Sequence, residues 1–342
     1  MNKNIYILFD QAHDKDWLIE DLSKHYGTNR IKVLRLGVKS SEMEIKAGVF
    51  GKLLNLYYTL KPSIVVLFSS KKQDIIICWG SYAGLIVNFL SRFFCLRREL
   101  IFPGWLSPVR HQKTILLSKY AATNKHCQIT ITSPELEHLW ERHLNIKSIG
   151  NFHYVPDMFE GDNGYEIVTF KKDSYYFTGG MANRDWNLLM NVASRLPNLH
   201  FKCVALQSDF QSKTNSVPNN VEVFFNTDSA TYYELMREAK CILLPLVDTR
   251  KVSGLINIIR AAQFGVPCFV TDTLATAQYY EDKDFLLSPN VEDWISRIIS
   301  IEQLDSFDFV LKTSGFQNYI KTNFSREKVS SYFFDIIDNI SK

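Results

Sequence analysis

Hydrophobic positions in the first half of the chain fall into short apolar runs that alternate with stretches of helical periodicity. Short runs rich in β-branched residues are typical of buried strands, whereas apolar residues spaced three and four apart are typical of helices. The pattern predicts strands over residues 5–9, 31–36, 64–68, 75–79, 100–102 and 128–131. It predicts helices over residues 15–25, 47–60, 82–94 and 134–145, with Ser133 as the cap of the last one.

A stretch of Pro, Asp and Gly at residues 154–164 interrupts this pattern and predicts a linker. Beyond it the alternation resumes, with strands expected over residues 174–177, 201–205, 221–225, 241–245 and 268–271. Helices are expected over residues 185–195, 229–238, 255–264 and 291–299, and a long amphipathic helix over residues 324–340.

Near-continuous apolar strands that alternate with helices indicate parallel sheets covered on both faces. We therefore expect an α/β protein of two doubly wound, Rossmann-like domains that face a cleft. The first domain is predicted to span residues 1–155 and the second residues 165–322. Residues 323–342 are predicted to form a helix that packs back towards the first domain.

The 342 residues are enough for two separate cores at about 150 residues per domain. The six cysteines are scattered without a CxxC pair, as expected of buried thiols in a reducing compartment. No apolar run reaches the roughly 18 residues of a membrane span, and the N-terminus lacks a signal-peptide cleavage site. These features predict a cytoplasmic protein.

The net charge of +3 is unevenly distributed along the chain. Residues 1–150 contain 21 Lys and Arg against 12 acidic residues, whereas residues 151–342 contain 18 against 24. A basic half suggests an anionic partner, but the cations are spread out and no nucleic-acid-binding motif accompanies them, so nucleic acid is not expected. Residues 46–61 and 85–98 combine aromatic with basic side chains. They predict either peripheral attachment to an anionic membrane surface, on the inner face of the plasma membrane, or core helices with basic ends.

One strand–turn–helix segment is suited to bind a diphosphate. The strand that begins near Ser174 runs into Gly179 and Gly180, and a helix opens after Asn183 and Arg184. The glycines allow close approach of a ligand, and Arg184, expected to be exposed at the helix start, adds a positive charge. The alternative is a tight turn with a solvated Arg184.

A second segment has a similar design. Arg250 and Lys251 follow a predicted strand, and Ser253, Gly254 and Leu255 then begin a helix whose first N–H groups lack partners. Both helix starts follow the carboxyl ends of strands, where open α/β sheets bind ligands. The alternative is that Ser253 is an ordinary N-cap.

These segments, together with the order of motifs around them, resemble the donor domain of GT-B glycosyltransferases. The pattern is similar to glycosyltransferase family 4 and related transferases of bacterial polysaccharide assembly. The resemblance covers residues 129–340, and in the first 128 residues it rests on architecture alone. It implies a nucleotide-sugar donor, with its diphosphate near Gly179, Gly180, Asn183, Arg184, Arg250, Lys251, Ser253, Gly254 and Leu255, and its base near Phe225 and Asn226.

The sequence departs from the family at two positions. The family has two glutamates eight positions apart, where this chain has Val252 and Arg260. The carboxylate that grips the ribose is therefore missing, and Arg260 is expected either to contact phosphate or to face solvent.

The catalytic base is sought in the first domain. His13 and Asp14 follow its first strand, and His111 follows the strand over residues 100–102. Asp14 could instead cap a helix, and a lone histidine is often structural.

The resemblance implies a hexosyltransferase that moves a sugar from a nucleotide sugar to a glycan acceptor, which we expect to be lipid-linked, as in lipopolysaccharide or capsule assembly. No cofactor or metal is expected, because cations and helix N-termini surround the predicted diphosphate. Two alternatives stay open: a nucleotide-sugar epimerase of the same fold, and a non-catalytic binding subunit.

Overall fold

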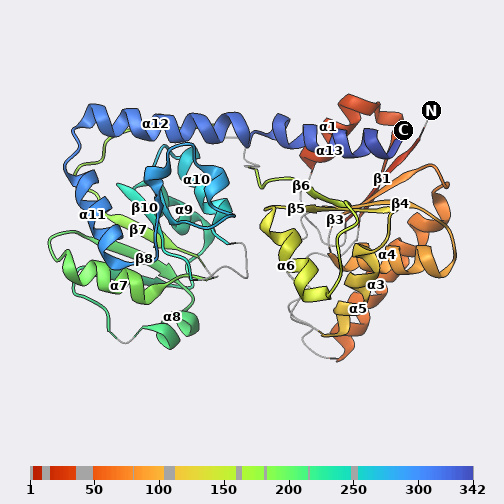
Figure 1. Ribbon diagram of the computed structural model, residues 1–342, viewed down its shortest axis with the longest axis horizontal. Coiled ribbons are helices and arrows are strands. Elements are labelled where there is room, and N and C mark those ends of the chain that lie inside the picture. The colour runs from red at the N-terminus through yellow and green to blue at the C-terminus, as the bar shows by residue number, and fades with distance from the viewer. Residues whose placement is uncertain are drawn as a thin grey trace. The chain divides into compact units, whose positions relative to one another are not determined.

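The computed structural model describes residues 3–9, 16–35, 49–79, 81–103, 112–158, 164–180, 183–214, 216–247 and 253–341. The chain divides into two compact units (Figure 1). Unit 1 comprises Met1–Pro156 together with Val329–Lys342, and unit 2 comprises Asp157–Lys328. The last residues of the chain thus belong to the same unit as the first.

Unit 1 contains a six-stranded parallel sheet in the order β2-β1-β3-β4-β5-β6. Its strands are β1 (Ile5–Phe9), β2 (Ile31–Arg35), β3 (Ile75–Trp79), β4 (Glu99–Phe102), β5 (Cys127–Ile131) and β6 (Phe152–Tyr154). Ile5 pairs with Ile31 on one side and with Ile75 on the other. Every residue of β1 is buried, as expected of a central strand covered by helices on both faces.

The helices of unit 1 are α1 (Asp16–Tyr26), the short η1 (Thr28–Arg30), α3 (Val49–Ser69), α4 (Ser81–Phe93), α5 (Gln112–Ala122), α6 (Glu135–Leu144) and, from Val329 onwards, α13 (Arg326–Ser341). Phe333 of α13 packs against Trp17 and Trp79, with ring centroids 6.4 and 6.1 Å apart. The Tyr26 hydroxyl donates to Asp338 Oδ1 at 2.9 Å, so aromatic packing and a polar contact both hold α13 in unit 1.

The strand predicted over residues 64–68 is wrong, because these residues continue helix α3 through Pro62. Val66 and Leu67 are buried, whereas Ile64 and Phe68 are 43 % and 63 % exposed. This burial follows the helical period rather than the alternation of a strand. A short β-branched run does not distinguish the two by its composition.

Unit 2 contains a second six-stranded parallel sheet, in the order β12-β11-β10-β7-β8-β9. Its strands are β7 (Tyr176–Gly179), β8 (Phe201–Ala205), β9 (Val221–Phe225), β10 (Cys241–Leu244), β11 (Cys268–Thr271) and β12 (Leu286–Leu287). Read from β9 this is the strand order of dinucleotide-binding folds, with its reversal between β7 and β10. The α/β class with two Rossmann-like domains is confirmed.

The helices of unit 2 are α7 (Trp186–Arg195), α8 (Gln207–Lys213), α9 (Ser229–Arg237), α10 (Leu255–Gln263), α11 (Val291–Glu302) and α12 (Ser306–Asn323), with short η2 (Ala277–Tyr279) and η3 (Lys283–Phe285). The sequence pattern did not predict α5, α8, α12, β6 or β12. Within the described ranges, no helix is both long and apolar enough to cross a membrane.

Candidate functional site

The two predicted helix starts meet at the point of unit 2 where the strand order reverses. β7 and β10 are adjacent, but the chain leaves β7 towards β8 and leaves β10 towards β11. Loops that diverge from neighbouring parallel strands leave a crevice at the carboxyl edge of the sheet, which is where such folds bind ligands. The structure therefore brings together the segments that follow Gly179 and Leu244.

Backbone contacts join the two loops at this edge. The Asp185 N–H donates to the Pro245 carbonyl at 2.9 Å, and the Val247 N–H donates to the Asn183 carbonyl at 3.0 Å. Between them Arg184 and Leu246 form an isolated antiparallel bridge. The loop after β7 is thus held in a defined position by the loop after β10.

The two glycines of the first loop are required by packing. Gly180 has φ +130°, and a Cβ added there would lie 2.5 Å from Arg184 Nη2. A Cβ added at Gly179 would lie 2.5 Å from Cε2 of Tyr232. The glycines therefore let the Arg184 and Tyr232 side chains lie directly against the end of β7.

Arg184 is buried, which corrects the expectation that it is exposed or solvated at a helix start. Its side chain is 3 % exposed, and Nε donates to the Gly179 carbonyl at 2.8 Å. Burial lowers the pKa of the guanidinium, although the Tyr232 hydroxyl and the Cys268 thiol act in the opposite direction. Because a guanidinium stays charged at neutral pH, a positive charge is fixed at the end of β7.

Two residues of this cluster were missed by the sequence reasoning. The Asn257 amide of α10 donates to the Gly179 carbonyl at 3.1 Å. The Tyr232 ring of α9 is partly buried, and desolvation raises the pKa of its hydroxyl to about 12, against the opposing effects of Arg184 and Asn257. Asn257 could have been found as an amide in the first turn of a helix that opens at a ligand-binding edge, whereas no signal marks Tyr232.

The second helix start, that of α10, has no side-chain cap. The N-cap of α10 is Gly254, with φ +85°, and no side chain caps the helix. The alternative that Ser253 is an ordinary N-cap is therefore wrong. Leu255 is buried and anchors the first turn, whose N–H groups are not occupied by a cap side chain.

By contrast, the start of α7 has a side-chain cap. The Asp185 carboxylate accepts from the Leu188 N–H at 2.9 Å, and the preceding Asn183 adopts a left-handed φ of 54°. Of the two helix starts, α10 is thus the one that can offer N–H groups to an anion.

Phe225 ends β9 and Asn226 follows it, two strands from β7 and hence about 10 Å away across the sheet. Phe225 is 37 % exposed and packs against Phe210, with ring centroids 5.7 Å apart. Asn226 has a left-handed φ of 53°, and its N–H donates to the Ala205 carbonyl at 3.3 Å. An exposed ring thus lies at the same sheet edge as Arg184.

Arg260 lies in the last turn of α10. Its guanidinium is 4.8 Å from the centroid of the Tyr233 ring, and Nη1 donates to Gln263 Oε1 at 3.0 Å. Six residues of helix separate it from Gly254, which is a rise of about 9 Å. Arg260 is therefore attached to the side of the helix, away from its N-terminus.

Five predicted site residues lie outside the described residues. They are His13, Asp14, His111, Arg250 and Lys251. Among the residues that the structure does describe, no group of three His, Cys, Asp or Glu could hold a metal ion.

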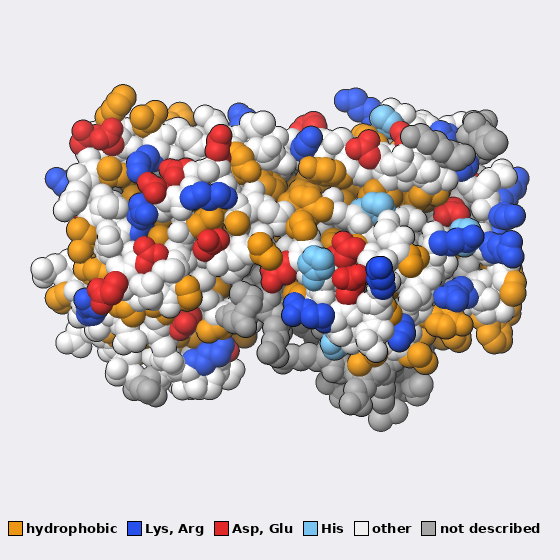
Figure 2. Space-filling view, viewed as in Figure 1, with side chains coloured by type: hydrophobic (Ala, Val, Ile, Leu, Met, Phe, Trp, Pro, Cys, Tyr) orange, Lys and Arg blue, Asp and Glu red, His pale blue; other side chains and the backbone are white. Residues whose placement is uncertain are grey.

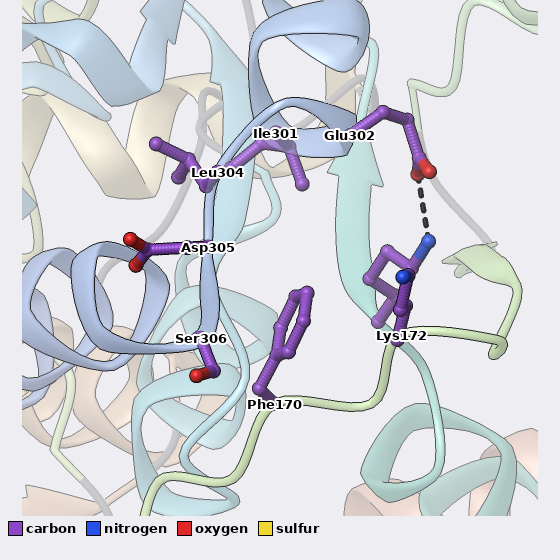
Figure 3. A pocket seen from close by; sticks show the side chains of 8 residues that line it. Phe170, Lys172, Ile301, Glu302, Leu304, Asp305 and Ser306 are labelled. Atoms are coloured by element: carbon purple, nitrogen blue, oxygen red, sulfur yellow. Dashed lines mark hydrogen bonds and ion pairs between the residues drawn. The ribbon is translucent and has the colours of Figure 1, made fainter.

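A cavity of about 350 Å³ lies at the opposite edge of the same sheet (Figure 3). Phe170 and Lys172 line it from the segment before β7, and Glu302 lines it from the end of α11. The Glu302 carboxylate binds the ammonium group of buried Lys240 at 2.7 Å and accepts from the Tyr176 hydroxyl at 2.6 Å. Its buried cation, Lys240, is already neutralised by Glu302, which leaves only the exposed Lys172, so this cavity is the poorer candidate for an anionic ligand.

No family model and no curated protein matches the chain. Its structure is similar to that of HepE from Anabaena in complex with UDP, with a TM-score of 0.69 and 12 % identity over 98 % of this chain and 100 % of that one. HepE in complex with UDP-glucose has a TM-score of 0.68 and 12 % identity over 98 % of this chain and 99 % of that one. An α,α-trehalose-phosphate synthase (UDP-forming) from Burkholderia vietnamiensis has a TM-score of 0.64 and 7 % identity over 99 % of this chain and 100 % of that one. At these identities the likeness shows the fold, which is GT-B.

Proposed function

We propose that the protein is a glycosyltransferase that uses a nucleotide-sugar donor, bound in unit 2 where β7 and β10 end. The observation that carries the proposal is the convergence of buried Arg184 with the open N-terminus of α10 on two adjacent strands. The solved structures of the same fold support it, because HepE was crystallised with UDP and with UDP-glucose.

In this proposal the chain binds the donor through its diphosphate. The first-turn N–H groups of α10 hydrogen-bond to phosphate oxygens, and Arg184 adds a fixed positive charge beside them. Arg250 and Lys251 precede α10 in the sequence and contribute two further cations. As the bond from the sugar to the diphosphate breaks, negative charge grows on the leaving group, and these groups stabilise it without a metal ion.

The exposed ring of Phe225 is proposed to lie near the base of the nucleotide. An aromatic ring offers a stacking surface to any base, so it favours nucleotide binding without selecting one base. Asn226 supplies an amide next to it. The general base that activates the acceptor is sought among His13, Asp14 and His111.

For the acceptor we propose a lipid-linked glycan of the kind used in lipopolysaccharide or capsule assembly. The excess of Lys and Arg in residues 1–150 supports an anionic partner for the acceptor domain. A lipid-linked acceptor would also require the enzyme to work at a membrane surface, as a peripheral protein.

A non-catalytic GT-B-like subunit is the second candidate, and Arg260 is the observation that favours it. This residue occupies the position of the family's ribose-binding glutamate, and its guanidinium is engaged with Tyr233 and Gln263. Such a chain would still bind a nucleotide, but it would turn nothing over.

Product analysis separates these candidates. The protein is incubated with UDP-, GDP-, ADP- and CMP-sugars, with and without a lipid-linked glycan extract. A transferase releases the nucleotide, which is UDP, GDP or ADP from the diphosphate donors and CMP from a CMP-sugar, and it forms a glycosidic bond only when acceptor is present. Release without acceptor dependence, an epimerised donor, or nucleotide binding without turnover would each contradict the transferase proposal.

A further inference from the structure

Four phenylalanines of unit 1 form a continuous exposed cluster, which we call the aromatic face. Phe68 belongs to α3, Phe89 and Phe93 belong to α4, and Phe94 follows directly. Their exposed fractions are 63 %, 42 %, 69 % and 47 % in that order. Ring centroids are 5.8 Å apart for Phe68 and Phe94, 5.1 Å for Phe93 and Phe94, and 6.1 Å for Phe89 and Phe93. Large aromatic side chains on a soluble surface are usually scattered singly, so a joined cluster marks an interaction site.

The third helix of this layer extends the apolar surface. Leu116 of α5 is 70 % exposed, and Tyr120 is 41 % exposed. The guanidinium of Arg92 on α4 lies 3.8 Å from the centroid of the Tyr120 ring and donates to the Tyr120 carbonyl at 3.0 Å, so α4 and α5 are tied together. Ile64 and Val65 on α3 are each 43 % exposed. Figure 2 shows hydrophobic and basic side chains side by side on the part of unit 1 that these helices cover.

The charge around the aromatic face has one sign. Among the side chains of residues 45–134 that the structure describes, eight are Lys or Arg and only two are acidic, Asp74 and Glu99. Asp74 is fully buried and accepts from the backbone N–H groups of Asn4 and Lys71. Glu99 lies 2.7 Å from His126 Nδ1. Both carboxylates are thus engaged locally, and the outward charge of this layer is positive.

The topology collects these cations at one edge. Since the strands are parallel, the turns that follow α3, α4 and α5 all lead into the amino ends of β3, β4 and β5. Each turn contains an exposed cation: Lys71 and Lys72 follow α3, Arg97 follows α4, and Lys125 follows α5. Arg97 and Lys125 also line a cavity of about 600 Å³ between the last two turns. A row of cations therefore borders the exposed rings.

We propose that the aromatic face docks on an anionic phospholipid bilayer. The rings enter the interface between headgroups and acyl chains, and the bordering cations bind lipid phosphates. A second protein would cover an apolar face equally well, but the uniform positive charge beside it matches an anionic surface. This inference relies on the proposed function only to explain what docking achieves, namely that it brings a transferase to a lipid-linked acceptor.

The structure also decides which cations can test this proposal. Arg98 donates to the Ser70 hydroxyl at 3.0 Å and to the Ser70 carbonyl at 2.8 Å, so it holds the end of α3. Changing Arg92 or Arg98 would therefore disturb the helices themselves. Arg97 and Lys125 are exposed and suit substitution.

The test is flotation of the full chain with vesicles of phosphatidylcholine alone or of equal parts phosphatidylcholine and phosphatidylglycerol. We expect binding to the anionic vesicles at low ionic strength, and weaker binding at about 0.15 M salt, where the Debye length is about 8 Å. Phe68→Ser with Phe93→Ser should reduce the partition coefficient about tenfold for each ring removed. Arg97→Glu with Lys125→Glu should reduce it at least about fivefold for each site.

Matched controls come from unit 2. Phe307→Ser removes a ring that is 73 % exposed, and Lys172→Glu reverses an exposed charge, and both variants should bind as the wild type does. The proposal is overturned if the wild type ignores anionic vesicles at low salt, or if the unit 1 and unit 2 variants lose binding equally. It is also overturned if the double serine variant changes the oligomeric state but not vesicle binding, since the face would then contact another copy.

UDP binding by the same proteins keeps the two proposals apart. Vesicle binding by a wild type that binds none of UDP, GDP, ADP and CMP would contradict the proposed function and support the membrane surface. UDP binding without vesicle binding would support the proposed donor site and contradict the membrane surface.

Discussion

In the proposed function, donor binding in unit 2 depends most on Arg184. Its charge is buried at the end of β7, where Nε is held by the Gly179 carbonyl. Replacing it with alanine should weaken UDP binding about tenfold to a hundredfold, because a charge-assisted hydrogen bond contributes about 1.5–3 kcal/mol. Calorimetry measures the affinity, after a melting curve has shown that the variant is folded.

Arg195→Ala is the matched control for this substitution. Arg195 also lies in unit 2, but it is exposed and forms a surface ion pair with Glu292. Exposed ion pairs contribute little to stability, and no nucleotide contact is expected. Equal UDP affinity in Arg184→Ala and Arg195→Ala would remove Arg184 from the site.

Gly180 tests the local geometry that places Arg184. An alanine there would have φ +130° and a Cβ 2.5 Å from Arg184 Nη2. We expect Gly180→Ala to lower the free energy of unfolding by roughly 1–3 kcal/mol and to weaken UDP binding. Gly150→Ala is the control, because its φ is +77° but no atom lies within 4 Å of the added Cβ. An unchanged UDP affinity in Gly180→Ala would mean that the loop's geometry does not matter for the donor.

At the residue scale, local signals predicted the two strand–turn–helix segments that meet at the sheet edge but not how their side chains lie. The Gly-Gly turn and the helix start at Gly254 are visible in the sequence because strand, turn and helix signals are local. The surroundings of Arg184 include Tyr232, and the Gly179 carbonyl that it contacts also accepts from Asn257; both residues come from helices later in the chain. No local pattern reports such a contact.

At the element scale, helix α12 offers a direct test of helix propensity. Gly315 lies inside this helix, and a Cβ added there would meet nothing within 4 Å. Gly315→Ala should raise the free energy of unfolding by roughly 0.5–1 kcal/mol, because glycine loses more backbone freedom on folding. Chemical denaturation measures the change.

Gly84 in α4 gives the opposite result for the same substitution. A Cβ there would lie 2.9 Å from the Phe102 ring, so Gly84→Ala should destabilise despite its better helix propensity. If both alanine variants shift stability in the same direction, packing around these helices differs from the structure.

The closing helix α13 should be essential to unit 1. Phe333 is 2 % exposed and packs between Trp17 and Trp79. Phe333→Ala should lower the free energy of unfolding by about 3–5 kcal/mol, which tryptophan fluorescence can follow during denaturation. Phe307→Ala, at a ring that is 73 % exposed, should change it little. If Phe333→Ala lowers the free energy of unfolding by less than Phe307→Ala does, the packing of α13 is contradicted.

Elements whose hydrophobic residues follow a regular strand or helix period were predicted, and elements without such a period were missed. The strands over residues 5–9, 75–79, 201–205, 221–225 and 268–271 agree with the structure to the residue. In α12 the buried Phe309, Phe316 and Ile320 follow a helical period, but exposed Phe307 and Leu311 blur the stripe. Residues 64–68 failed for a related reason, since an exposed apolar face resembles a buried strand in the sequence.

At the scale of the whole molecule, strand order decides where a ligand can bind. The alternation of strands and helices predicted two parallel α/β domains, because each element is encoded locally. The adjacency of β7 and β10 is a non-local property, and it is what brings Gly179 and Gly254 to one edge. The catalytic candidates His13, Asp14 and His111 stay predictions, since they lie outside the described residues.

Metal independence is a prediction about turnover by the proposed transferase. The groups proposed to neutralise the diphosphate are Arg184, Arg250, Lys251 and the α10 N-terminus, which would repel a divalent cation. Turnover in excess EDTA should equal turnover in buffer, and added Mg²⁺ or Mn²⁺ should change it little. A tenfold loss with chelator that Mn²⁺ restores would contradict this arrangement.

Hydrogen exchange with and without UDP locates the nucleotide most directly. Binding at the carboxyl edge of the unit 2 sheet should protect peptides that cover residues 176–188 and 244–260. Peptides that line the cavity at the opposite edge, around Phe170 and Glu302, should exchange at the same rate in both states. Protection confined to that cavity or to unit 1, or no protection at saturating UDP, would contradict a donor site at β7 and β10.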